Sequence, residues 1–317
     1  MAESKRMKQQ QWHDNAFPQI IEADGTDNLS EYLTRAKPQL DIDLAKTGAI
    51  LFRGFAVPTV NDFDSAVEAY GEENFPYADS LSNAVRINLT PRVFTANEAP
   101  PETSIFLHHE MAQTPIYPSK LFFYCNIAAA EGGATPICRS DILLEILQDE
   151  NPHLVDDFAN KGVRYTHSMP GQDDAASGQG RSWRSTLGVE DQDSAETRLS
   201  DLGYSWQWLE HDALRVTSPR LDAVRTLSDG RRTFFNQLIA AYRGWADERN
   251  DPAKSICFGD GSAIAADQMQ VAIDLADELS FDLQWQSGDV ALIDNFLVMH
   301  GRRPFKGKRK VLASLIK

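Results

Sequence analysis

The spacing of hydrophobic residues predicts amphipathic helices in three parts of the chain. In residues 58–71, four hydrophobic side chains recur at the intervals of one helical face: Phe63, Ala66, Val67 and Tyr70. Thr59 can cap the start of this helix and Gly71 can end it. We expect a second helix that Ser140 or Asp141 caps, and a third over residues 265–279.

Hydrophobic runs rich in aromatic and β-branched residues predict strands elsewhere. They lie at 49–55, 120–128, 204–210, 289–295 and 310–316. Gly, Pro and Asp turns separate these runs, and the sequence lacks the regular alternation of strand and helix that a parallel sheet requires. The pattern therefore predicts an α+β fold, mainly β, in which an antiparallel barrel or sandwich carries helices on its outside.

The middle of the chain, at roughly 165–235, has a different composition. Residues 168–183 read SMPGQDDAASGQGRSW and are rich in Gly, Ser and Asp, which predicts a long loop. Loops of this length in compact domains are often lids or binding loops. The fragment at 178–180 is too weak a glycine pattern to indicate a phosphate site.

The charge balance narrows the classes of partner. The chain has 31 basic and 46 acidic residues and a formal net charge of -15, which disfavours nucleic acid and anionic membranes as partners. Neither a secretory signal nor a membrane-spanning run is recognisable. Three cysteines without a CxxC pair, Cys125, Cys138 and Cys257, indicate reduced thiols in a cytoplasmic protein.

A candidate metal site begins in the stretch FLHHEM, residues 106–111. If this stretch is extended, His108 and Glu110 point to one side and His109 points to the other. A third ligand, His300, ends the hydrophobic run that precedes the basic turn GRRPF. Two His and one carboxylate leave open positions on an octahedral ion, which suits non-haem Fe(II). A lone His-x-Glu occurs by chance in many proteins, so the prediction depends on the joint pattern.

Two further residues suit the co-substrate 2-oxoglutarate. Its distal carboxylate requires a planar, permanently charged guanidinium and a hydroxyl donor. Arg309 stands at the start of the last predicted strand, and Thr135 follows a glycine turn, where we expect it to be exposed. Lys310 is the competing base, but on a strand it points away from the face of Arg309.

Taken together, these motifs resemble the taurine dioxygenase and clavaminate synthase-like family of Fe(II)/2-oxoglutarate-dependent oxygenases, especially its clavaminate synthase-like branch. The similar segments are LFRGF, VFTANEAPP, HHEMAQTPIYPSKLFFYC, EGGATPI and DNFLVMHGRRPF with GKRKVLASL, spread over nearly the whole chain. Many members carry Asp where this chain has Glu110, and the clavaminate-like branch accepts Glu.

The resemblance implies a single domain over 1–317 with a double-stranded β-helix (jelly-roll) core and outer helices. A loop- and helix-rich insertion would occupy roughly 141–285. His108, Glu110 and His300 map onto the metal triad, and Thr135 and Arg309 map onto the 2-oxoglutarate site. Related halogenases replace the carboxylate with a small residue to admit chloride, so Glu110 disfavours halogenation.

The implied activity is hydroxylation of an unactivated C–H bond with Fe(II), 2-oxoglutarate and O2, releasing succinate and CO2. The expected partner is a small-molecule substrate, an amino acid or similar polar metabolite, free or attached to a carrier protein. Candidate substrate-binding residues are Asn97, Glu98, Arg181 and Arg184. The sequence leaves desaturation and ring closure open beside hydroxylation.

Two other functions fit parts of the same pattern. Two His and one Glu also form the site of zinc-dependent hydrolases, which would not need Thr135 or Arg309. A non-catalytic jelly-roll binding protein could keep the fold without the activity, although the intact triad argues against it.

Overall fold

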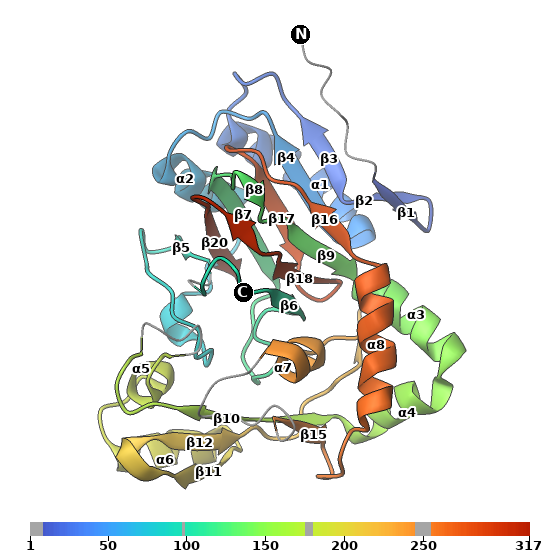
Figure 1. Ribbon diagram of the computed structural model, residues 1–317. Helices are drawn as coiled ribbons and strands as arrows, with labels where there is room; N and C mark the ends of the chain where they lie inside the picture. The colour runs from blue at the N-terminus through green and yellow to red at the C-terminus, as the bar shows by residue number, and fades with distance from the viewer. Residues whose placement is uncertain (1–8, 97–98, 175–179, 245–254) are drawn as a thin grey trace.

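The computed structural model describes residues 9–96, 99–174, 180–244 and 255–317. Two facing β-sheets form its core (Figure 1). The larger sheet has the order β3 (Gln19–Glu22), β4 (Ala49–Arg53), β17 (Val290–Asp294), β7 (Lys120–Ile127), β20 (Lys310–Ile316) and β5 (Phe94–Thr95). The smaller sheet has the order β16 (Phe281–Leu283), β9 (Thr135–Arg139), β18 (Val298–Arg302) and β6 (Ile105–His108).

Strand pairing within both sheets is antiparallel except between β3 and β4, which run parallel. Successive side chains of β7 point to opposite faces of the sheet, so they pack into two different hydrophobic layers. Leu121 and Phe123 pack between the sheets against residues such as Ile137 of β9, whereas Phe122 and Tyr124 pack on the outer face. The predicted antiparallel jelly-roll core is confirmed.

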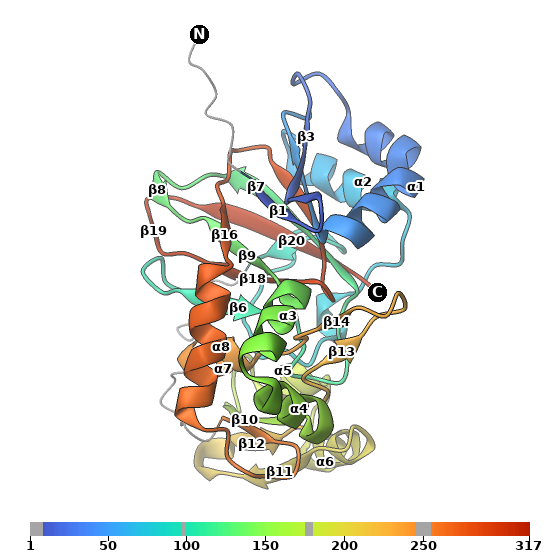
Figure 2. The same ribbon diagram turned by 90° about the vertical axis from the view of Figure 1, so that its right-hand side faces the viewer.

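The outer face of the larger sheet is covered by α1 (Leu29–Thr47) and α2 (Val60–Tyr70), as Figure 2 shows. The helix predicted between Thr59 and Gly71 is confirmed. Thr59 forms a capping box with Asp62, and Gly71 ends the helix at a φ of 78°, where a residue with a Cβ would be strained.

Helix α3 (Ser140–Glu150) packs on the outer face of the smaller sheet, against β9 and β18, and α4 (Pro152–Lys161) and α8 (Ala266–Glu278) pack with α3 in one hydrophobic cluster. Helix α8 confirms the prediction for 265–279, but the predicted cap of α3 is wrong. Neither Ser140 nor Asp141 caps the helix, because tertiary partners use both side chains. Ser140 Oγ donates to Leu297 O at 3.1 Å, and the Asp141 carboxylate accepts from Arg139 Nε at 2.7 Å.

The segment between the core strands β9 and β16 contains its own sheet, in the lower part of Figure 1. Its order is β11 (Ser205–Trp208), β12 (Leu214–Thr217), β10 (Val163–Met169) and β15 (Ile256–Phe258). Helices α5 (Trp183–Leu187) and α6 (Gln192–Asp201) pack on it around the buried Trp183. Residues 170–174 and 180–182 lie in no helix or strand, as expected for the loop predicted at 168–183, and β11 confirms the strand predicted at 204–210. The loop-rich character expected of the wider middle is wrong, because strands and helices fill much of 165–235.

The insertion predicted at 141–285 overlaps the core at its end, because β16 belongs to the smaller core sheet. The single-domain organisation stays a prediction. The remaining elements are short: β1 (Gln10–Trp12), β2 (Asn15–Phe17), η1 (Tyr77–Asp79), β8 (Glu131–Gly132), η2 (Glu210–Asp212), β13 (Arg225–Thr226), β14 (Arg232–Thr233), α7 (Leu238–Gly244) and β19 (Phe305–Lys306).

The three cysteines are all free thiols, with Cys125 and Cys138 buried and Cys257 partly exposed. Burial raises the pKa of the Cys125 thiol to about 12, so this thiol stays protonated at neutral pH. In the part of the chain that the structure describes, no helix has the length and apolar character to cross a membrane.

The buried carboxyl group of Asp294, at the end of β17, makes the stability of the fold depend on pH. Burial raises its pKa to about 6, although Phe296 N donates to its Oδ1 at 2.8 Å and Lys120 and Arg231 lie near. The folded protein thus holds a proton on Asp294 at a pH where the unfolded chain has lost it. This group's contribution to stability is complete below about pH 4 and falls as the pH rises to about 6.

We therefore expect Asp294→Asn to stabilise the protein at neutral pH. The amide removes the cost of burying the charge, so the free energy of unfolding at about pH 7.5 should rise by on the order of 1–3 kcal/mol. The gain should vanish near pH 4, where the native carboxyl is already neutral. Urea titrations at both pH values measure this, with Asp149→Asn on exposed α3 surface as the control. A gain of equal size at both pH values would contradict the assignment.

Candidate metal centre

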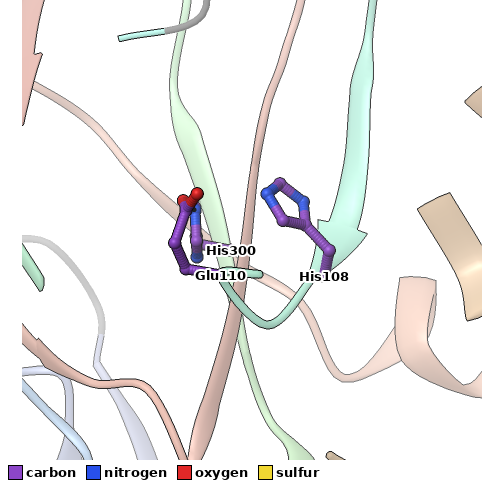
Figure 3. A group of neighbouring side chains, drawn as sticks. All are labelled: His108, Glu110 and His300. Carbon is purple, nitrogen blue, oxygen red and sulfur yellow. Dashed lines mark ion pairs between the residues drawn. The ribbon is translucent and has the colours of Figure 1, made fainter. Parts of the chain in front are cut away.

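Strand pairing in the smaller sheet brings two histidines of the candidate site together. His108 ends β6, and His300 lies directly opposite it on β18 in the antiparallel register. The centroids of their imidazole rings are 4.4 Å apart. Figure 3 shows the two rings and the carboxylate of Glu110 gathered at this point. The candidate ligand atoms of His108, Glu110 and His300 all lie within 4.8 Å of one another.

A turn, and not an extended strand, carries Glu110 to this point. Strand β6 ends at His108, and the following residues turn, with Met111 in the left-handed region at a φ of 60°. The stretch FLHHEM is therefore not extended beyond His108, as the expectation had assumed, yet Glu110 does lie with His108. His109 is fully buried away from them, and its Nδ1–H donates to Asn295 O.

The side chain of Asn295 holds this turn in place. Glu110 N donates to Asn295 Oδ1 at 2.7 Å, and Asn295 Nδ2 donates to Glu110 O at 3.0 Å and to Pro118 O at 2.8 Å. Asn295 is fully buried, so these bonds replace water for the polar backbone of the turn. Sequence reasoning missed this role, since the residue is far from Glu110 along the chain and carries no motif of its own.

The environment keeps His108 in the form that binds metal. Its Nδ1–H donates to Phe106 O at 2.7 Å, which leaves Nε2 with a free lone pair. Burial, followed by the neighbouring His300, lowers the pKa of His108 to about 4. The imidazole is therefore neutral at physiological pH, as a metal ligand must be.

Glu110 divides its two carboxylate oxygens between different partners. Oε1 accepts a hydrogen bond from Arg86 Nη2 at 2.9 Å, while Oε2 lies 3.4 Å from His300 Nε2. Burial opposes ionisation, but the Arg86 guanidinium together with His300 and His108 outweighs it and holds the pKa of Glu110 well below its usual range. Among the described residues, the buried Oε2 atom has no hydrogen-bond donor. Such an atom is costly unless a cation binds there, so the donor set fits a divalent metal ion.

These residues line a pocket with an empty volume of about 500 Å³. The described residues of its lining are Arg86, Ala96, Ile105, His108, Glu110, Phe123, Thr135, His300, Gly301, Arg302, Arg309 and Val311. The structure thus brings the predicted metal residues and both predicted 2-oxoglutarate residues into one cavity. Lys310 is not part of the described lining, in keeping with the strand alternation expected for it.

Thr135 and Arg309 lie next to each other in this pocket. Arg309 Nη2 is 3.5 Å from Thr135 Oγ1, and Arg309 Nε donates to Gly133 O at 2.9 Å. Thr135 is only 4% exposed, so the expectation that it would be exposed is wrong. The reason is that it begins β9, where Trp285 Nε1 donates to its Oγ1 at 2.9 Å. Burial lowers the pKa of Arg309 to about 10, which leaves it charged at neutral pH.

Of the four predicted substrate residues, the two that the structure describes, Arg181 and Arg184, do not line the pocket. Asn97 and Glu98 lie outside the described residues. Arg181 Nη1 donates to Ser80 O and Ser82 O, both at 3.1 Å, and Arg184 Nη1 pairs with Asp212 Oδ2 at 2.7 Å. Both arginines are absent from the described lining: Arg181 joins the insertion to the segment at 80–82, and Arg184 forms an ion pair within the insertion. Arg86 is the site residue that sequence reasoning missed, since no motif links it to Glu110.

Comparisons with known proteins agree with this geometry. A clavaminate synthase-like protein of Arabidopsis thaliana is 42% identical over 290 residues, which cover 91% of this chain and 87% of that protein. The dapdiamide synthesis protein DdaC of Enterobacter agglomerans is 30% identical over 292 residues, covering 87% of this chain and 84% of its own.

Solved structures show the same fold. Asparagine oxygenase in complex with Fe(II), 2S,3S-3-hydroxyasparagine and succinate superposes with a TM-score of 0.55 at 13% identity, over 90% of this chain and 79% of that one. The sequence matches the family described as taurine catabolism dioxygenase TauD, TfdA family, over residues 13–315. The chain therefore belongs to the TauD/TfdA family and is a 2-oxoglutarate-dependent non-haem iron dioxygenase, with Fe(II), 2-oxoglutarate and O2 as its cofactor and co-substrates.

Proposed function

We propose that this enzyme hydroxylates an unactivated C–H bond of an amino acid or a similar small polar metabolite, while 2-oxoglutarate is converted to succinate and CO2. One observation carries the proposal: three candidate ligand atoms within 4.8 Å of one another share a pocket with Thr135 and Arg309. The zinc hydrolase and the non-catalytic binding protein would both leave Thr135 and Arg309 without a role in that pocket.

In this proposal His108, Glu110 and His300 hold Fe(II). When bound, the metal supplies the activation of dioxygen, a reaction for which protein side chains have no suitable group. The protein contributes two imidazoles and one ionised carboxylate, and these are held by the β6–β18 pairing and by Asn295. Glu110 and His300 are buried and His108 is partly buried, which limits the access of bulk water to the metal.

Arg309 and Thr135 would bind the distal carboxylate of 2-oxoglutarate. The Arg309 guanidinium is oriented by its bond to Gly133 O, which leaves its terminal nitrogens for an anion. Thr135 Oγ1 accepts from Trp285 Nε1, so the Thr135 hydroxyl can donate its own hydrogen to the ligand. A Cβ at Gly133 would lie 3.0 Å from Arg309 Cδ, so this position suits a glycine.

The apolar side of the pocket and a structural neighbour support the substrate class. Ile105, Phe123 and Val311 give the pocket an apolar side against which a C–H bond can lie. The name of one structural neighbour, an asparagine oxygenase, supports an amino acid as the substrate.

Metal binding tests the ligand assignment. We expect His108→Ala to lose stoichiometric binding of Fe(II) in anaerobic equilibrium dialysis, because one of three donors is removed. His109→Asn is the matched control: the amide can replace the donor to Asn295 O, and His109 is turned away from the site. We expect this variant to bind one equivalent of iron. Retention of iron by His108→Ala with its loss in His109→Asn would reverse the assignment.

Co-substrate binding tests Arg309. We expect Arg309→Ala to weaken 2-oxoglutarate binding by on the order of 2–5 kcal/mol, the range for breaking a buried charged pair. Anaerobic titration of the Fe(II) protein measures this through the weak visible charge-transfer band of a chelated keto acid. Arg303→Ala is the control, since Arg303 pairs with Asp282 at the surface. An affinity of Arg309→Ala within about twofold of wild type would exclude the assigned role.

A further inference from the structure

Arg86 and Glu110 form a buried ion pair at the candidate metal centre. Glu110 has one more methylene than an aspartate and hence one more rotatable bond with which to turn its carboxylate. Its backbone is fixed by Asn295, so the remaining freedom lies in the side chain. That side chain is 4% exposed, and Arg86 Nη2 donates a hydrogen bond to its Oε1 at 2.9 Å.

The guanidinium of Arg86 is itself held in place. Its Cζ lies 5.0 Å from the ring centroid of Tyr77 and 5.4 Å from that of Phe94, and its side chain is 8% exposed. Both rings belong to the core between the sheets and lie 5.1 Å apart. Cation–π contacts on aromatic faces fix the plane of the guanidinium. Arg86 is therefore a rigid donor and not a flexible surface cation.

The two oxygens of Glu110 are consequently unequal. Oε1 is committed to Arg86, and Oε2, which has no donor among the described residues, faces His300. A carboxylate that presents one oxygen leaves three positions of an octahedral ion open, two for the keto acid and one for dioxygen. A carboxylate that presents both oxygens would occupy one of these positions.

We infer that Arg86 is a positioning residue that restricts Glu110 to a single ligand oxygen, so that the longer carboxylate leaves room for bidentate 2-oxoglutarate. The inference rests on the proposed function, because it assigns a role relative to the metal triad. The role depends on the contact of Arg86 with Glu110 and requires no contact of Arg86 with the substrate.

Two equilibrium measurements test the role: Mn(II) affinity of the metal-free protein, and 2-oxoglutarate affinity of the anaerobic Fe(II) protein. For Arg86→Met we expect Mn(II) affinity within about threefold of wild type, or tighter, because the cation that repels the metal is gone. We expect 2-oxoglutarate affinity to fall by about tenfold or more. A merely structural role would instead weaken both together.

The double variant Arg86→Met/Glu110→Asp supplies the decisive comparison. The shorter aspartate has less freedom to present both oxygens, so in this background Arg86→Met should change 2-oxoglutarate affinity by less than about threefold. Arg86→Lys keeps the charge and should recover part of the loss, and it replaces Arg86→Met if that variant does not fold. Arg92→Met is the control, because Arg92 lies six residues away and pairs with Asp64.

Each outcome decides the inference. A parallel loss of Mn(II) and 2-oxoglutarate affinity, or an equal loss in the Asp background, overturns it. Unchanged 2-oxoglutarate affinity in Arg86→Met also overturns it while leaving the proposed function intact. If wild-type protein binds Fe(II) but not 2-oxoglutarate, the proposed function is wrong and the inference falls with it.

Discussion

The pairing of β6 with β18 is the constraint on which the site depends. It places His300 opposite His108, although the two residues lie far apart in the sequence. Asn295, in the turn that leads into β18, then binds the backbone of Glu110 on the turn that leaves β6. One pair of neighbouring strands therefore supplies two imidazoles and positions the carboxylate, and a small shift in register would separate all three.

Charge in the pocket runs opposite to charge on the whole protein. The chain carries a net charge of -15, yet Arg86, Arg302 and Arg309 all line a pocket whose one described carboxylate is Glu110. Burial is the main cause of the lowered pKa of Arg309, and the positive charge of Arg302 lowers it further. An anion bound between the two guanidinium groups would reduce the repulsion between them, so the charges of the pocket favour a dicarboxylate.

Much of the fold could be predicted because many of its helices and strands have clear signals in the local sequence. Strands such as β7 and β20 are nearly continuous apolar runs, and α2 carries its own cap and stop. No helix was expected for 29–47, where α1 contains Pro38 and many polar residues. Of the four strands in the sheet of the insertion, β11 alone was predicted from the sequence. The candidate site could be predicted as far as its motifs reach. Arg86 and Asn295 could not, because they act through contacts distant in sequence.

The extended conformation expected at Glu110 is wrong for a general physical reason. Several candidate site residues stand at or next to strand ends: His108 closes β6, Thr135 opens β9, and Arg309 directly precedes β20. Periodicity describes a residue only while the chain stays in the element, and it fails one or two residues beyond. At such positions the backbone is rigid on one side and free to turn on the other. Buried partners then determine the direction in which the chain or side chain points. Asn295 holds the turn, and Arg86 holds the carboxylate of Glu110. A site at strand ends is thus held firmly by the sheets, yet its orientation is set by residues that no local pattern reveals.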